Sequence, residues 1–208
     1  RNPFNPNQIT KYRISPEVVD AISFCTKNPA PFFPYMDLLK KHKQCWFVTI
    51  TPYGKEIEPY VPDKERVMES FCHLSERIGK NAVIWRYDPI LFTKRYTPEY
   101  HLKAFGQMAE ALRGYTEKCV ISFVDTYAKN KKNLQALGVY ELPKEETEAF
   151  AKALCDIAKE NGMVTASCAE QMDLVHCGIA RNACVDKTLI EEIIGCKFPL
   201  VQIGIEFR

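Results

Sequence analysis

The pattern of hydrophobic and polar positions repeats one unit along the chain, in which a short apolar run ends in polar residues. The runs of this kind are Ile22–Asn28, Cys45–Thr51, Val83–Ile90, Cys119–Asp125 and Val164–Glu170. Their apolar residues, rich in β-branched and aromatic types, favour buried strands. A helical pattern follows each of the first four runs. This alternation predicts right-handed βαβ units and a parallel sheet.

Helix signals stand between these runs. The predicted helix starts are Asp63, Thr97, Pro143 and Asp186. The start at Thr97 is the strongest, because a threonine can cap a helix and a proline suits its first position. We expect Thr126–Leu142 to be the longest loop, Gln171–Val185 to be irregular and Leu200–Ile205 to form a sixth strand.

Five to six such units predict an α/β protein with a parallel, TIM-like partial (β/α) barrel, which fits the chain better than a complete eightfold barrel. A doubly wound open sheet is the alternative. It is disfavoured because the sequence has no glycine-rich first turn and no sign of a reversal of strand order. The chain shows no linker and no low-complexity segment, so we expect residues 1–208 to form a single domain.

Composition narrows the possible functions. The net charge is only +2 and no basic face stands out, so nucleic acid is not an expected partner. No apolar run approaches the roughly 18 residues of a membrane helix. The nine cysteines are odd in number and spread along the chain, which predicts a reducing, cytoplasmic setting. No G-x-G-x-x-G or Walker loop occurs, which argues against a standard dinucleotide or P-loop site.

The polar residues at the predicted strand ends carry the candidate chemistry, because the ends of parallel strands gather at one edge. Arg86 and Asp88 alternate with Trp85 and Tyr87, so one pair faces inward and the other packs on helices. An inward arginine can clamp a carboxylate or a phosphate. The alternative is a structural Arg–Asp pair that closes the end of the barrel.

Other strand ends supply further candidates. We expect Lys27, Asp125 and Glu170 to act as catalytic groups. The residues expected to bind substrate or cofactor are Arg86, Asp88, Thr26, Asn28, Thr51 and Cys168. The competing interpretation is that Lys27 is a surface residue. The hydroxyls of Thr49, Thr51 and Tyr53 are further candidates to contact a ligand, although threonine is also a common strand former.

A group of potential metal ligands follows the fifth run. Three cysteines, one histidine and two carboxylates lie between Cys168 and Cys184. The spacings differ from those of zinc ribbons and fingers, and buried cysteine commonly behaves as a small apolar residue. A metal site here is therefore a minor hypothesis.

Several motifs together resemble an uncharacterised prokaryotic family, a domain-of-unknown-function family. They are Asn2-Pro3-Phe4-Asn5, Thr26-Lys27-Asn28-Pro29, Ile84-Trp85-Arg86-Tyr87-Asp88-Pro89-Ile90, Ser122-Phe123-x-Asp125-x-Tyr127, Cys168-Ala169-Glu170-x-x-Asp173-Leu174, and Gly178-Ile179 followed by Ala183-Cys184-Val185-Asp186. The resemblance spans nearly the whole chain. It implies a (β/α) barrel of the radical S-adenosylmethionine type, with a [4Fe–4S] cluster and S-adenosylmethionine, but no known reaction.

Two departures from that family concern the ends of the chain. Family members are expected to carry a first strand upstream of Arg1 and a C-terminal C-x₃-C-x₂-C cluster. Neither occurs in this sequence. The chain is therefore expected to be either a fragment of a longer enzyme or a shortened member that has lost the chemistry.

Three functions follow from these observations. The first is the barrel core of a radical S-adenosylmethionine-like iron–sulfur enzyme of unknown substrate. The second is a non-redox barrel that binds a small anionic ligand, as a hydrolase, a lyase or a binding protein. The third is a structural or partner-binding domain whose missing ends are supplied by another chain.

Overall fold

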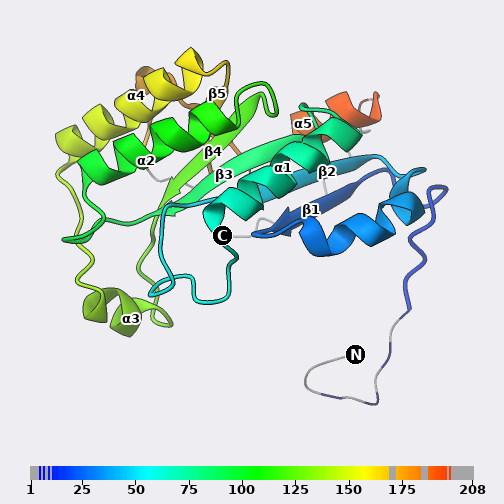
Figure 1. Cartoon of the computed structure of the whole chain (residues 1–208), viewed down its shortest axis with the longest axis horizontal. Coiled ribbons are helices and arrows are strands. Elements are labelled where there is room, and N and C mark those ends of the chain that lie inside the picture. Colours follow the sequence, from blue (N-terminus) through cyan, green and yellow to red (C-terminus); the bar gives the residue numbers. More distant parts are fainter. Residues whose placement is uncertain are drawn as a thin grey trace.

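The structure is a computed structural model, and it describes residues 5, 7, 9, 11–168, 172–183, 187–195 and 197. Its centre is a six-stranded sheet in which every strand pairs in parallel with the next strand of the chain (Figure 1). The strands are β1 (Ile22–Thr26), β2 (Gln44–Thr49), β3 (Val83–Ile90), β4 (Lys118–Phe123), β5 (Val164–Cys168) and β6 (Ala180–Asn182). The predicted parallel α/β fold is confirmed.

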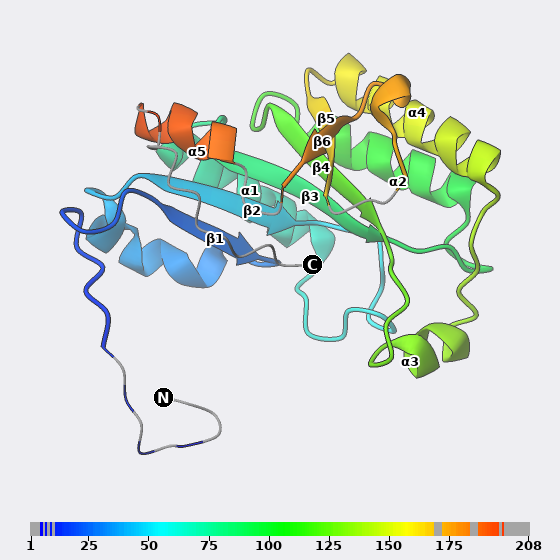
Figure 2. The same ribbon diagram turned by 180° about the vertical axis from the view of Figure 1, so that it is seen from behind.

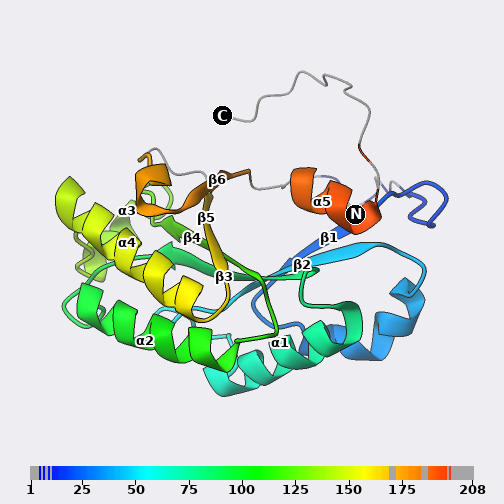
Figure 3. The ribbon, with the colours of Figure 1, turned by 90° about the horizontal axis from the view of Figure 1, so that it is seen from above.

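Helices cover both faces of this sheet. They are the 3₁₀ helix η1 (Ala30–Leu39), α1 (Lys64–Ile78), α2 (Pro98–Ala111), α3 (Lys131–Ala136), α4 (Lys144–Glu160), the 3₁₀ helix η2 (Val175–Cys177) and α5 (Lys187–Ile194). Figure 3 shows α1, α2 and α4 along one face, here called the outer face, and α5 on the opposite, inner face. Viewed from behind, α5 lies in front of the sheet, and β6 continues the sheet beyond β5 (Figure 2). No helix in the described part of the chain is long and apolar enough to cross a membrane.

Two apolar clusters fix which side chains face which way. On the outer face, Trp85 and Tyr87 are buried against α2, and Trp85 stacks on Phe105 with ring centroids 4.7 Å apart. The inner face carries the smaller cluster, formed by Cys45, Phe47, Ile84, Val120, Cys168 and Leu189. The predicted alternation of Trp85 and Tyr87 with Arg86 and Asp88 across the two faces is therefore correct.

The sheet is open, with β1 and β6 at its two edges. The predicted barrel is not confirmed, because no pairing between these edge strands closes the described sheet. The strand order follows the chain without the reversal that defines a doubly wound sheet.

The region after β5 differs from its prediction. Gln171–Val185 was expected to be irregular, yet η2 and β6 lie within it. The strand was missed because its three residues are mostly exposed and show no apolar alternation; backbone pairing with β5 creates it. The predicted strand Leu200–Ile205 lies outside the described residues.

The predicted loop Thr126–Leu142 also differs, because it contains the short helix α3. Only Leu134 of this helix is buried, so it offers no helical apolar stripe to recognise. The helix predicted from Thr97 is confirmed as α2, and the Thr97 hydroxyl accepts a hydrogen bond from the Tyr100 backbone amide at 3.2 Å.

Candidate functional site

The inner face changes from apolar to polar toward the carboxyl ends of its strands. Thr49 follows Phe47 by two positions on β2 and therefore points to the same face. Thr49 pairs with Arg86 across β2 and β3, and Lys27 directly follows Thr26, the last residue of β1, which pairs with Val48. We call Lys27, Thr49, Arg86, Asp88 and Ser122 the polar layer.

Arg86 and Asp88 form the centre of this layer. The guanidinium of Arg86 donates a hydrogen bond to Oδ2 of Asp88, while the hydroxyl of Ser122 donates to Oδ1 at 2.5 Å. Both side chains of the ion pair are partly buried, with 24% of Arg86 and 16% of Asp88 exposed. The Nε atom of Arg86 is buried and has no hydrogen-bond partner among the described residues. Because Nε is shielded from solvent, the donor of Arg86 that remains for a ligand is Nη1, since Nη2 donates to Asp88.

A tyrosine holds the end of β3 in place. The Tyr53 hydroxyl donates to the carbonyl oxygen of Pro89 at 2.8 Å and accepts from the backbone amide of Leu91 at 2.9 Å. Burial raises the pKa of Tyr53, so the phenol keeps the proton that it donates. This bridge fixes the backbone directly after Asp88.

A buried histidine completes this support from the outer face. Nε2 of His101 lies 3.0 Å from the carbonyl oxygen of Leu91, which can only accept, so Nε2 carries the proton. Nδ1 then accepts from the Tyr87 hydroxyl at 2.7 Å. Burial lowers the pKa of His101 to about 4, so the ring is neutral at pH 7.

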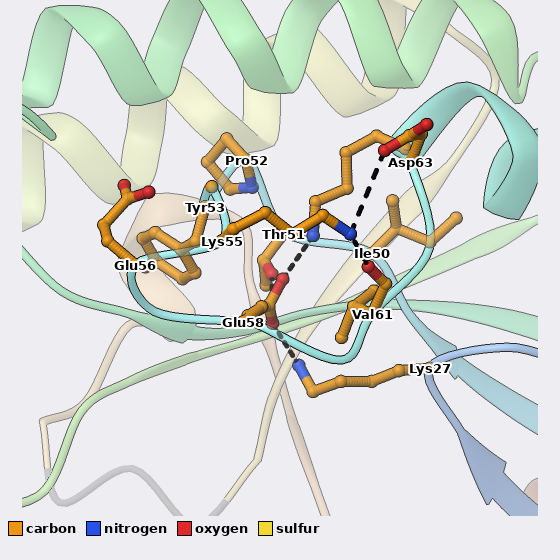
Figure 4. Close-up of polar contacts among 12 residues, drawn as sticks. Lys27, Ile50, Thr51, Pro52, Tyr53, Lys55, Glu56, Glu58, Val61 and Asp63 are labelled. Atoms are coloured by element: carbon orange, nitrogen blue, oxygen red, sulfur yellow. Dashed lines mark hydrogen bonds and ion pairs between the residues drawn. The ribbon is translucent and has the colours of Figure 1, made fainter.

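A second polar network lies beside the layer and is centred on Glu58 (Figure 4). Lys27 donates to Oε1 of Glu58 at 2.6 Å, Thr51 donates to the same oxygen at 2.9 Å, and Lys64 donates to Oε2. Only 8% of the Glu58 side chain is exposed. Burial alone would raise the pKa of Glu58, but the hydrogen bonds from Lys27 and Lys64 outweigh it and hold the pKa below its ordinary value.

Sequence reasoning missed Glu58. Its only signal was an acidic residue inside the long loop that follows Thr51 and crosses the carboxyl edge. Its three donors come from the end of β1, the end of β2 and the start of α1. A pattern within one segment cannot show such a convergence.

A protein-family model described as Domain of unknown function (DUF1848) matches residues 1–205. The chain belongs to this family. No curated protein matches the chain. The family match covers every strand of the sheet and all of the polar layer, and it carries no statement of activity.

In this family member, two of the predicted binding residues shape a turn. The Thr26 hydroxyl accepts from the Asn28 backbone amide at 3.0 Å, and the Asn28 side-chain oxygen accepts from the Ala30 amide at 3.1 Å. Thr26 pairs with Val48, whose side chain is buried in the outer-face cluster, so the side chain of Thr26 also points to the outer face. These contacts connect β1 to η1 and leave Lys27 as the residue of this motif in the polar layer.

The other predicted site residues are spread over several places. Thr51 is buried and holds Glu58, and Cys168 is buried in the inner-face cluster. Asp125 is exposed in the loop after β4, where its carboxylate accepts from the Tyr127 hydroxyl at 2.9 Å. Glu170 lies outside the described residues. The structure thus joins Arg86 to Asp88 on the inner face and brings Lys27 and Thr51 together around Glu58.

The potential metal ligands after β5 make other contacts. Asp173 forms an ion pair with Arg181 at 3.3 Å, and His176 lies 3.5 Å from a carboxylate oxygen of Glu148. Cys177 is buried. Within the described ranges, no three His, Cys, Asp or Glu side chains gather closely enough to hold a metal ion. Cys184 lies outside those ranges.

Proposed function

We propose that this protein binds a small anionic molecule over the polar layer, with Arg86 as its main anchor. The observation that carries the proposal is the partly exposed side chain of Arg86, whose guanidinium donates to Asp88 through Nη2 and makes no other hydrogen bond among the described residues. It lies at the carboxyl edge of a parallel sheet, where ligands of open α/β proteins bind. A planar guanidinium suits a carboxylate or a phosphate.

The charges around the layer support an anion over a cation. Three cationic side chains, Lys27, Lys64 and Arg86, gather with two carboxylates, Glu58 and Asp88. The local surplus is therefore one positive charge. A ligand with one negative group would neutralise this surplus, whereas a cation would add to it.

The proposed ligand chemistry leaves the reaction class open between two candidates. In the non-redox candidate, a hydrolase, lyase or binding protein, the anchored anion lies near a carboxylate that acts as base. Asp125 and Glu170 are the proposed bases. Exposed Asp125 could serve only if the ligand extends along the edge toward the loop after β4.

The second candidate is the barrel core of a radical S-adenosylmethionine-like iron–sulfur enzyme. The resemblance of the Trp85-to-Pro89 and Cys168-Ala169-Glu170 motifs supports it, as does a parallel sheet whose strands follow chain order. Such a cluster is held by three cysteine thiolates. The described cysteines do not form a group of three ligands, so this part of the chain does not fit a cluster, and we derive no step through one.

The anion proposal is tested by thermal unfolding in the presence of phosphates and carboxylates. We expect at least one of these compounds to raise the melting temperature of the wild-type protein, by an amount equivalent to about 2.7 kcal/mol at one hundred times its Kd. Arg86→Met should abolish that rise. Arg95→Met is the matched control, because Arg95 is 66% exposed and pairs with Glu56. A rise that survives Arg86→Met would refute Arg86 as the anchor.

Iron analysis separates the two candidates. Iron and acid-labile sulfide are measured with the visible spectrum after anaerobic purification and reconstitution, on this chain and on a form extended at both ends. Iron and sulfide in the extended form, together with binding of S-adenosylmethionine, would favour the radical candidate. If neither this chain nor the extended form holds iron and sulfide, the radical candidate fails and the non-redox candidate stands.

A further inference from the structure

We infer that the anionic group of the ligand is an oxyanion seated over Thr49, with Lys27 on one side and Arg86 on the other. This inference rests on the proposed anion site and makes it more specific. It assigns Thr49 a role in binding and names a carboxylate or phosphate group as the part of the ligand that is recognised.

Thr49 pairs with Arg86 across β2 and β3, and Lys27 directly follows Thr26, the last residue of β1, which pairs with Val48. These three residues, here called the row, therefore lie at the carboxyl ends of three neighbouring strands. Neighbouring strands are about 4.8 Å apart, so the backbone of Thr49 lies about that far from the backbone of Arg86. Two long cationic side chains can converge over the short hydroxyl between them.

Each member of the row has a donor left for a ligand. The ammonium of Lys27 donates one hydrogen bond to Glu58, and the Lys27 side chain is 41% exposed. Arg86 keeps its Nη1, since Nη2 donates to Asp88. The hydroxyl of half-buried Thr49 makes no hydrogen bond within the described part of the chain. Together they offer an ammonium, a hydroxyl and a guanidinium donor to one acceptor group.

The surroundings of the row favour a single oxyanion. Directly below it on the same face are Phe47, Ile84 and Val120, all buried in the inner-face cluster. Apolar groups beneath the row lower the local dielectric and strengthen charge-assisted hydrogen bonds. The carboxylate of Asp88 already binds Arg86 and Ser122, and it would repel a second negative group on the Arg86 side.

The test is titration of the wild-type protein with inorganic phosphate and, separately, with acetate, followed by backbone amide NMR. We expect shifts at Thr49 and Arg86 with at least one of the two anions, and the tighter anion distinguishes a phosphate-bearing from a carboxylate-bearing ligand. Thr49→Val keeps the shape of the side chain and removes the hydroxyl. It should weaken binding about tenfold, the effect of one hydrogen bond to a charged group. Lys27→Met should weaken it by a similar factor.

Matched variants control for changes in folding. Thr165→Val makes the same substitution on β5, where Thr165 pairs with Cys119 and so faces the outer side of the sheet. Lys80→Met removes a lysine that forms an ion pair with Glu117, away from the polar layer. Both should bind the anion as the wild type does. Circular dichroism and the melting temperature confirm that each variant is folded.

The outcomes separate this inference from the broader proposal. Binding that depends on Arg86 but is unchanged in Thr49→Val and Lys27→Met would overturn the inference and leave the Arg86 proposal standing. Absence of any shift at the polar layer with either anion would overturn both.

Discussion

At the scale of single residues, the charged groups near the carboxyl edge are held by partners from other segments. Glu58 illustrates this, because one buried carboxylate receives hydrogen bonds from Lys27, Thr51 and Lys64. A buried charge is stable only when its hydrogen-bonding capacity is met. Glu58 therefore ties the loop after β2 to β1 and α1, beside the polar layer.

Glu58→Gln should lower the free energy of unfolding by about 2 kcal/mol at pH 7, because it removes a charge that two lysines hold. The expected loss of unfolding free energy is modest because the Lys27 side chain is 41% exposed and solvent screens its charge. Urea unfolding at pH 7 measures the loss. Glu69→Gln, on the exposed side of α1, is the control and should change stability little.

The same variant should show a definite pH dependence. The pKa of Glu58 in the folded protein is below its ordinary value of 4.5, so its stabilising contribution is complete above pH 4.5. It is lost as the pH falls through the lowered pKa. The difference in stability between wild type and Glu58→Gln should therefore shrink below pH 4.5. A difference that stays constant down to pH 3 would contradict this assignment.

At the scale of elements, helix starts of similar appearance in the sequence differ in the structure. Thr97 and Asp63 both precede helices and both are good capping residues. The Thr97 side chain accepts from an amide of α2, whereas Asp63 makes no side-chain capping bond to α1. Asp63 instead lies 3.9 Å from Lys55, with both side chains well exposed.

Thr97→Ala should therefore destabilise the protein by about 1 kcal/mol, the usual cost of losing an N-cap hydrogen bond. Asp63→Ala is the comparison variant, and it should cost less because an exposed ion pair contributes little. Thermal unfolding of both variants measures the contrast. Equal losses would indicate that the Thr97 hydrogen bond does not stabilise α2.

At the scale of the whole molecule, two apolar clusters on opposite faces hold the sheet between layers of helices. The outer cluster is large and joins β2, β3 and β4 to α1, α2 and α4. The inner cluster is small and depends on α5, whose Leu189 packs with Phe47, Ile84 and Val120. The polar layer lies at the carboxyl side of this inner cluster.

Leu189→Ala should lower the free energy of unfolding by about 2–3 kcal/mol, because it opens a cavity against the inner face. Glu192→Ala, an exposed change on the same helix, should have little effect. Chemical denaturation of the two variants tests this. A Leu189→Ala variant as stable as the wild type would show that α5 contributes little to packing on the sheet.

Local sequence patterns are enough to predict the parallel α/β class, five of the strands and most of the helices. They also assign Arg86 and Asp88 to the face opposite Trp85 and Tyr87. These follow from local rules. Period-2 and helical spacings specify strands and helices, and alternation along β3 separates its polar residues from its apolar ones.

The remaining features arise from contacts between distant segments. The open sheet, β6 and the convergence on Glu58 depend on pairings and contacts between segments far apart in the chain. The row of Lys27, Thr49 and Arg86 depends on the pairing of three neighbouring strands, which no single strand encodes. Local patterns fix what each segment forms, whereas the polar layer exists only where those segments are brought side by side.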